Sequence, residues 1–314
     1  MKRGPILTLG IAIYLCGAVG SGIAQQPFAH NNGGVASHWT IGIYTGPSPL
    51  QLASPANINN PVLTAADVHD LKNVDTLAHP FMVIEGSRYY MFFTAKYLKT
   101  GESGIGLAES DNGRVWHYKR LVLKVPYTLA YPYVFKWQND YYMVPEAHTE
   151  AFLRLYKATA FPDKWEYQKD LLKGDHFVQS TLVRHEDLWW MFVCAKGNDT
   201  LRLFYAADLQ APWTEHPQSP VIRGNLHAAR TAGRPFLLDG KLYRLGMDCL
   251  PVYDYQVHAF QITGISTTAY AEKMIETPVV KATGKGWNAA AMHTVDAHQI
   301  GKNHWIAAVD ALGN

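Results

Sequence analysis

Hydrophobic and polar residues follow one another along this 314-residue chain in a unit that recurs. Each unit has an apolar stretch, a short polar turn and a stretch rich in aromatic residues, which is the pattern of a β-hairpin. Clear copies occupy residues 79–93, 131–145 and 179–193, and weaker copies occupy residues 234–247 and 297–309. The pattern therefore predicts an all-β chain built from repeats.

Aromatic residues give the period of this repeat. One position in the second strand of the clear copies holds Tyr90, Tyr142 and Trp190, at spacings of 52 and 48 residues. A strand of small and apolar residues follows each clear hairpin and leads to a tryptophan, at positions 116, 165 and 213. Four short strands in each repeat of roughly 50 residues are typical of a propeller blade.

The two ends of the chain complete the blade count. The last hairpin, over residues 297–310, has no trailing strands after it, whereas residues 39–44 and 61–63 read as unpaired strands. We expect these N-terminal strands to close the last blade, because closure removes the free sheet edges of an open array. The prediction is a five-bladed β-propeller over residues 38–314. Two stacked β-sandwiches are the alternative, but the regular period favours the propeller.

The first 24 residues have the pattern of a secretory signal peptide. Lys2 and Arg3 precede an apolar run over residues 6–19, and small residues follow at Gly22 and Ala24. The mature protein is then expected to be secreted or periplasmic, with no membrane span after cleavage. A membrane anchor is the alternative, although the run is shorter than the ~20 residues that a spanning helix needs.

Charge and cysteine content narrow the classes of partner. The net charge is +2 with both signs interspersed, so the chain has no basic run for nucleic acid or anionic membranes. Cys194 and Cys249 remain after cleavage, as either one disulfide or two buried thiols. Aromatic residues make up 12% of the chain and suit the apolar faces of sugars, although they also build β cores.

Propeller geometry selects the candidate site. The innermost strand of a blade starts at the face to which the second strand returns, so residues at these two points share one mouth. Before the first strands lie His79, Tyr131, Gln179, His227 with Arg230, and His293 with Asp296 and His298. After the second strands lie Lys96, Glu146 with His148, Lys196, Asp248 and Asp310. Such convergent polar groups predict a binding site.

Carboxylates of this ring are the catalytic candidates. Glu146 follows an aromatic strand, where a raised pKa would suit a general acid. Asp248 or Asp296 would be the second carboxylate that glycoside hydrolysis needs. A salt bridge for Glu146, and turn or channel-lining roles for the two aspartates, are the alternatives.

Further candidates are binding residues. Trp287 with Asn288, and His227 with Arg230, are predicted to clamp the ligand, with Arg230 suited to a carboxylate or phosphate. His293, Asp296 and His298 lie within six residues and leave open a divalent metal site. The alternative is a hydrogen-bonded channel lining that grips sugar hydroxyls. No cofactor is required.

Several linked motifs resemble one known family. Tyr-Pro-Tyr-Val-Phe at 131–135, Tyr-Tyr-Met-Val-Pro-Glu at 141–146, Asn-Asp-Thr-Leu-Arg-Leu-Phe-Tyr at 198–205, Pro-Trp-Thr-Glu-His-Pro at 212–217, and Gly-Trp-Asn at 286–288 with Met-His-Thr-Val-Asp-Ala-His-Gln at 292–299 carry it. They look like the N-terminal domain of plant glucosamine inositolphosphorylceramide transferases and its bacterial relatives, over about residues 38–310. In the plant proteins, the resemblance implies, a separate C-terminal glycosyltransferase domain transfers the sugar.

The domain also resembles, more distantly, five-bladed glycosidases such as arabinanases and fructosidases. Those enzymes carry acidic residues where this chain has His79, Tyr131 and Gln179, so their usual catalytic set is not reproduced. We therefore expect an exported carbohydrate-active protein, a glycoside hydrolase-like enzyme acting on a glycan at the propeller mouth. The alternative is a non-catalytic glycan-binding propeller.

Overall fold

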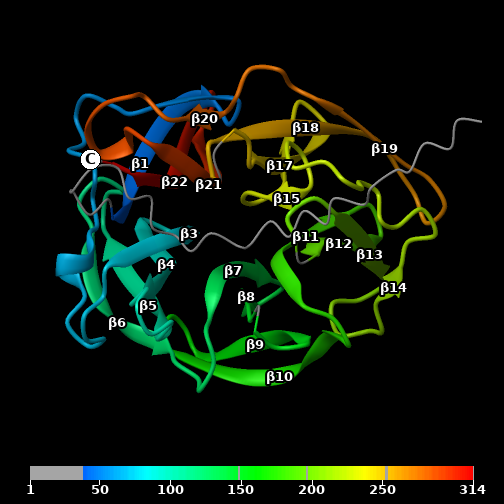
Figure 1. The fold of residues 1–314 in the computed structure, drawn as a ribbon, viewed down its shortest axis with the longest axis horizontal. Helices are drawn as coiled ribbons and strands as arrows, with labels where there is room; N and C mark the ends of the chain where they lie inside the picture. Colours follow the sequence, from blue (N-terminus) through cyan, green and yellow to red (C-terminus); the bar gives the residue numbers. More distant parts are fainter. Residues whose placement is uncertain (1–37, 148, 196, 252–253, 314) are drawn as a thin grey trace, which may run out of the picture.

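The chain folds into five β-sheets arranged around a central axis (Figure 1). The structure, a computed structural model, describes residues 38–147, 149–195, 197–251 and 254–313. The predicted all-β, five-bladed propeller is confirmed. The predicted signal peptide, His148 and Lys196 lie outside the described residues. No helix in the part of the chain that the structure describes has the length and apolar content of a membrane span.

Three blades have four consecutive strands each. The first contains β3 (Thr76–Glu85), β4 (Arg88–Lys96), β5 (Ser103–Ser110) and β6 (His117–Leu123). The second contains β7 (Ala130–Trp137), β8 (Asp140–Glu146), β9 (Phe152–Ala160) and β10 (Lys164–Lys173). The third contains β11 (Phe177–His185), β12 (Leu188–Ala195), β13 (Leu201–Ala206) and β14 (Thr214–Glu215). Neighbouring strands in each blade pair antiparallel, as expected for successive hairpins.

The fourth blade is less regular. Its inner strand is split into β15 (Arg230–Thr231) and β16 (Phe236–Leu238), which both pair with β17 (Lys241–Asp248). It continues through β18 (Gln256–Ile265), β19 (Tyr270–Met274) and the short β20 (Val280–Lys281). The described residues also include two short 3-10 helices, η1 (Ala65–Asp67) and η2 (Gly286–Asn288).

The fifth blade joins the two ends of the chain. Here β1 (Trp39–Ser48) pairs with β22 (His304–Leu312), from Trp39 opposite Leu312 to Gly46 opposite Trp305. Strand β2 (Gln51–Ala53) extends this sheet outward, and β21 (Ala291–Gly301) is its inner strand. The prediction that N-terminal strands close the last blade is confirmed. The predicted pairing segment at residues 61–63 forms only a bridge, from Leu63 to Ile41.

A bulge recurs in the inner strands and directs side chains toward the axis. His79, Tyr131 and Gln179 occupy it in the first three blades, with φ angles of 54°, 46° and 44°. The strand register shifts at each of these points, and a corresponding shift surrounds His293 in β21. A bulge re-aims a side chain that regular alternation would turn into the sheet. Apolar clusters of residues from neighbouring blades form the hydrophobic core.

The inner strand of the last blade begins earlier than predicted. The sequence placed its start at Ala297, but β21 starts at Ala291. The bulge at His293 breaks the two-residue alternation, so the pattern became regular only after it. As a result, His293, Asp296 and His298 lie within the strand and not before it. The same correction applies to four other residues that were predicted to precede their inner strands and lie within them: His79, Tyr131, Gln179 and Arg230.

Candidate functional site

The mouth predicted from propeller geometry exists as a rim of strand ends. Thr76 at the start of β3 lies opposite Lys96 at the end of β4, and Phe177 at the start of β11 lies opposite Ala195 at the end of β12. The hairpin turns of the same blades lie at the other face of the ring. The polar residues that flank the paired strand ends therefore share one face.

Each of the five blades contributes one side chain to a buried polar cluster at this end of the channel. His79 Nε2 lies 3.0 Å from His293 Nε2 and 3.2 Å from Gln179 Nε2. Arg230 Nε donates to Gln179 Oε1 at 2.9 Å, and the Tyr131 ring stands edge-on to His79 at 5.5 Å. All five side chains are at most 4% exposed. The structure thus brings together five of the predicted binding residues, which we call the channel cluster.

The pKa values of the two histidines in the channel cluster depend on burial and on the neighbouring carboxylate of Asp310. Nδ1 of His293 lies 2.8 Å from Asp310, and this carboxylate raises the pKa of His293 against the opposing effect of burial. Burial, and then the neighbouring His293, lower the pKa of His79 to about 3. The pKa values of the two neighbouring imidazoles are therefore shifted in opposite directions, that of His293 upward and that of His79 downward.

Polar side chains at the ends of second strands hold the next blade. Asp310 accepts a hydrogen bond from the backbone nitrogen of His79 at 2.6 Å, and Glu146 accepts one from that of Gln179 at 2.9 Å. Thr94 Oγ1 accepts one from Tyr131 N at 3.1 Å. Each acceptor thus fixes the bulge of the following blade. This interblade role for Glu146 was not foreseen, and Thr94 was missed because a threonine in an aromatic strand gives no signal.

Asp296 lies deeper in the channel, within a second polar layer. Its carboxylate is 2.6 Å from Arg234 Nε and accepts from the backbone nitrogen of Met82 at 2.5 Å. Arg234 also donates to Val134 O at 2.7 Å. Burial alone would raise the pKa of Asp296, but Arg234 and then His298 lower it to about 2. Three inner strands are therefore tied together by an ion pair whose carboxylate is fully buried and whose guanidinium is 16% exposed. The catalytic role of Asp296 stays a prediction.

The predicted metal ligands fall into two separate groups. His293 contacts Asp310 and His79, whereas His298 Nε2 lies 2.8 Å from Asp296. In the described ranges, no three His, Cys, Asp or Glu side chains gather as a metal-binding group would. The geometry thus favours the channel-lining alternative for this segment.

Asp248 and His227 form a pair at the rim of the fourth blade. Nδ1 of His227 lies 2.8 Å from Asp248 Oδ1, and the same carboxylate accepts from Leu250 N and Gln256 Nε2. The His227 side chain is 57% exposed. This pair is the most accessible part of the predicted site.

Trp287 and Asn288 do not join the mouth. Asn288 Nδ2 donates to Tyr44 Oη at 2.7 Å, and its Oδ1 accepts from Thr283 Oγ1 at 2.8 Å. Trp287 packs so closely over Gly42 of β1 that a Cβ there would lie 2.3 Å from the indole. These contacts fasten the loop before β21 to the closing strand.

The two cysteines are free thiols. Cys194 and Cys249 are both buried, and burial raises the pKa of each to about 12. Of the two alternatives left open by the sequence, the structure therefore has the buried thiols.

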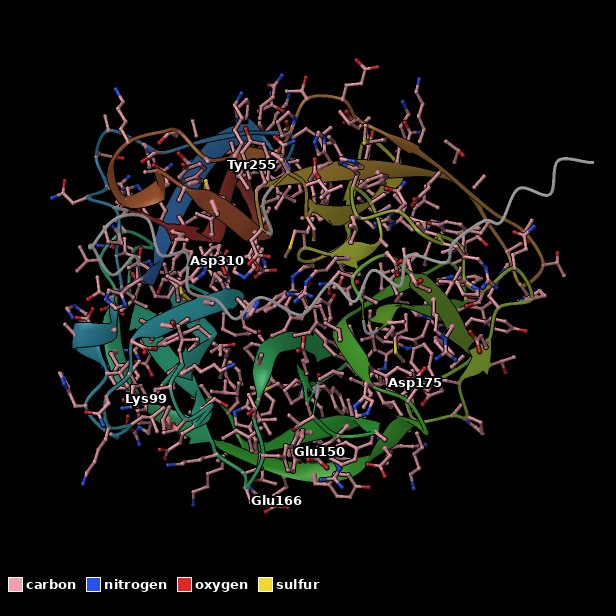
Figure 2. The ribbon with its side chains drawn as sticks, in the orientation of Figure 1. Lys99, Glu150, Glu166, Asp175, Tyr255 and Asp310 are labelled. Atoms are coloured by element: carbon pink, nitrogen blue, oxygen red, sulfur yellow. The ribbon has the colours of Figure 1, made fainter. Side chains whose placement is uncertain are left out.

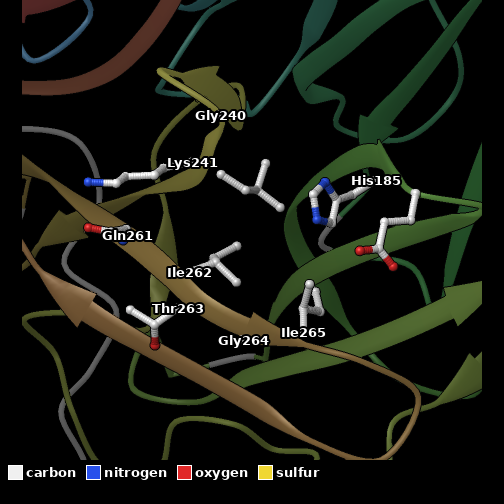
Figure 3. A pocket seen from close by; sticks show the side chains of 10 residues that line it. His185, Gly240, Lys241, Gln261, Ile262, Thr263, Gly264 and Ile265 are labelled. Carbon is white, nitrogen blue, oxygen red and sulfur yellow. The ribbon is translucent and has the colours of Figure 1, made fainter.

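A groove of about 410 Å³ lies elsewhere, between the third and fourth blades (Figure 3). Its lining includes His185 and Glu186 at the β11–β12 turn and Lys241 after the β16–β17 turn. Because hairpin turns lie opposite the mouth, this groove is separate from the channel cluster. Asp310, in contrast, is near the centre of the ring (Figure 2).

Five blades around a polar, largely buried channel define a fold that several carbohydrate-active enzymes share. A β-1,2-mannobiose phosphorylase from Listeria innocua matches 86% of this chain and 96% of its own with a TM-score of 0.61 and 13% identity. The catalytic domain of a GH62 α-L-arabinofuranosidase from Coprinopsis cinerea matches 77% of this chain and 92% of its own, with a TM-score of 0.59 and 13% identity. At such identities the likeness shows the fold alone.

Sequence comparison places the chain more narrowly. Residues 30–312 match the family described as glucosamine inositolphosphorylceramide transferase 1, N-terminal, and the chain belongs to this family. The rice (Oryza sativa subsp. japonica) protein named glucosamine inositolphosphorylceramide transferase 1 is 34% identical over 296 residues. The match covers 87% of this chain but only 40% of the rice protein. The resemblance inferred from the motifs is thereby confirmed.

Proposed function

We propose that this chain is a glycan-binding propeller that holds a carbohydrate at its mouth. The observation that carries the proposal is the channel cluster, to which all five blades contribute a polar side chain. Saccharide hydroxyls both donate and accept hydrogen bonds, and a site for them needs few, precisely placed polar groups. The cluster forms the floor of this site, and His227 with Asp248 forms part of its rim.

The carboxylates favour binding over hydrolysis. Hydrolysis by a carboxyl pair requires one acid whose pKa is raised. Asp296 does not meet this requirement, because Arg234 and then His298 lower its pKa to about 2 against the effect of burial. Glu146 and Asp248 are engaged within the protein, where they accept hydrogen bonds from the backbone nitrogens of Gln179 and Leu250. The test of the binding proposal therefore includes a search for products of the predicted hydrolysis.

The name of the rice relative suggests which saccharides to try. That protein is named for a transferase of glucosamine and inositolphosphorylceramide. We include glucosamine and an inositol phosphate among the probes, because this chain matches the N-terminal part of that family. A neutral disaccharide, β-1,2-mannobiose, serves as the comparison.

The proposal includes export, based on the N-terminal sequence pattern. Fractionation of expressing cells followed by intact-mass measurement tests it directly. Mature protein beginning at Gln25 in the periplasm or medium supports export, whereas unprocessed protein in the cytoplasm contradicts it.

Calorimetry of the full purified chain with the three probes tests binding. We expect binding of at least one probe that weakens roughly tenfold in Gln179→Ala, since hydrogen bonds of about 1.4 kcal/mol correspond to that factor. His304→Gln, at an exposed position that begins β22, is the matched control. A chelator should leave the affinity unchanged. Product released on long incubation would replace the binding proposal by catalysis, and absence of binding to every probe would overturn it.

A further inference from the structure

Each oxygen of the Asp248 carboxylate accepts a hydrogen bond from a group other than His227. Leu250 N donates to its Oδ1 at 3.0 Å, and Gln256 Nε2 donates to its Oδ2 at 3.1 Å. The Asp248 side chain is only 10% exposed and ends strand β17. Its position is therefore set by its own strand end and by the neighbouring strand β18.

His227 is held rigidly although its side chain faces solvent. Its backbone nitrogen donates to Asn225 Oδ1 at 3.0 Å, and Ala229 N donates to Asn225 O at 3.1 Å, so the residue sits in a closed turn. Cys249 N donates to Leu226 O at 2.9 Å, which fastens this turn to the end of β17. The imidazole is 57% exposed and points one nitrogen at Asp248.

The fold gains little from this arrangement. Exposed ion pairs contribute about 0–1 kcal/mol, and ordering an exposed side chain opposes even that gain. The ring orientation has a chemical consequence instead. A carboxylate at Nδ1 retains the proton there, which leaves the lone pair of a neutral imidazole on Nε2. His227 lies three residues before Arg230, whose guanidinium reaches the channel cluster.

We propose that Asp248 orients His227 so that its Nε2 accepts a hydrogen bond from a hydroxyl of the glycan at the mouth. Asp248 is then a positioning residue, and His227 is the specificity-determining residue that contacts the ligand. The site selects a donor group at this point and disfavours an ether, a carbonyl or a carboxylate oxygen. This inference rests on the proposed glycan binding and adds the group that the rim recognises.

The first measurement needs no ligand. Long-range ¹H–¹⁵N correlation spectra of the neutral imidazole distinguish the two tautomers, and His227→Ala assigns the signal. We expect the Nδ1–H tautomer in the wild-type protein and a shift toward the other tautomer in Asp248→Ala. A wild-type Nε2–H tautomer, or a tautomer unchanged in Asp248→Ala, overturns the role of Asp248.

The second measurement uses calorimetry with glucosamine, the inositol phosphate and β-1,2-mannobiose. We expect His227→Ala to weaken the best of these ligands roughly tenfold, with unchanged thermal unfolding and no effect of His304→Gln. Equal affinity in His227→Ala overturns the contact. If the wild-type protein binds none of the three probes, the proposed function fails and the ligand contact with it, whereas the tautomer measurement still decides the Asp248–His227 geometry.

Discussion

The Asp310 carboxylate at the end of β22 accepts a hydrogen bond from the backbone nitrogen of His79 in β3, at 2.6 Å. These residues lie 231 positions apart in the chain and on either side of the junction where the last blade meets the first. Asp310 also accepts from Thr294 N at 2.8 Å and lies beside His293. One fully buried side chain therefore joins the closing blade to the opening blade and fixes the channel cluster.

Asp310→Ala should lower the free energy of unfolding by about 3–5 kcal/mol, because it leaves the buried His293 imidazole and the backbone nitrogens of His79 and Thr294 without their acceptor. Chemical denaturation measures the change. Asp140→Ala, which removes an exposed ion pair with Lys157, is the control and should cost less than about 1 kcal/mol. Similar losses in the two variants would show that Asp310 does not secure the junction.

The fourth and fifth blades meet through backbone at Gly233. Ala232 O accepts from Val295 N at 2.9 Å, and a Cβ on Gly233 would lie 1.8 Å from Val295 O. Gly233→Ala should therefore lower the unfolding free energy by about 3 kcal/mol, through steric overlap and an unfavourable φ of 142°. Thermal and chemical unfolding measure this.

Gly264→Ala is the matched control for Gly233, because a Cβ at Gly264 meets nothing within 4 Å. It should be neutral or slightly stabilising. A Gly233→Ala variant as stable as Gly264→Ala would mean that the two blades are not in backbone contact.

The sequence predicts the fold more completely than it predicts the candidate site. Tyr90, Tyr142 and Trp190 recur at one place because each blade must bury the same face, and this regular burial gives the blade count. The ring then follows from the unpaired strands at both ends. The start of the last inner strand was harder to predict, because the bulge at His293 disrupts the alternation of apolar and polar residues by which a strand is recognised.

The sequence pattern predicted which residues lie near the mouth, but it did not predict which of them contact one another. His79, Gln179 and His293 are distant in sequence, and only ring closure makes them neighbours. Trp287 with Asn288 was predicted to clamp the ligand, yet the indole packs over Gly42 of β1. Such pairings depend on the close approach of backbones, which no local pattern records.

Acid should destabilise the protein partly through His79. Its folded pKa of about 3 lies below the ordinary value of about 6.5, so between these values the unfolded chain binds a proton that the folded chain does not. Stability is therefore lost as the pH falls from about 6.5 toward 3. His79→Gln should lose about 3 kcal/mol less than the wild-type protein between pH 7 and pH 4. Urea denaturation at several pH values measures both, and parallel curves would contradict the assignment.

The thiols of Cys194 and Cys249 should be inert in the folded protein. Burial raises their pKa to about 12, so the reactive thiolate is scarce and shielded. An aromatic disulfide reagent should label neither thiol in the native state and both in guanidinium. Rapid labelling of native protein would show that these strand ends open to solvent, and a lack of labelling in denaturant would reveal a disulfide.

Substitution of Asp296 tests whether the second polar layer of the channel stabilises the fold or takes part in catalysis. If its partner Arg234 is held in the channel by this carboxylate, Asp296→Asn leaves a buried guanidinium without its counter-charge and should cost about 3–5 kcal/mol. The double variant Asp296→Asn with Arg234→Gln should recover part of that loss, because the buried charge is then gone.

The pH dependence of the free energy of unfolding provides a second test of the role of Asp296. Because the folded pKa of Asp296 is lowered to about 2, its contribution to stability is complete above the unfolded value of about 3.8 and is lost as the pH falls through 2. Asp296→Asn should therefore reduce the slope of stability against pH below pH 4 and leave that slope unchanged above pH 5, where the whole curve is lower by the cost of the substitution. A stable Asp296→Asn variant that releases no product from a glycan which the wild-type protein cleaves would instead assign this carboxylate to catalysis, since a structural ion pair cannot be removed without cost to folding.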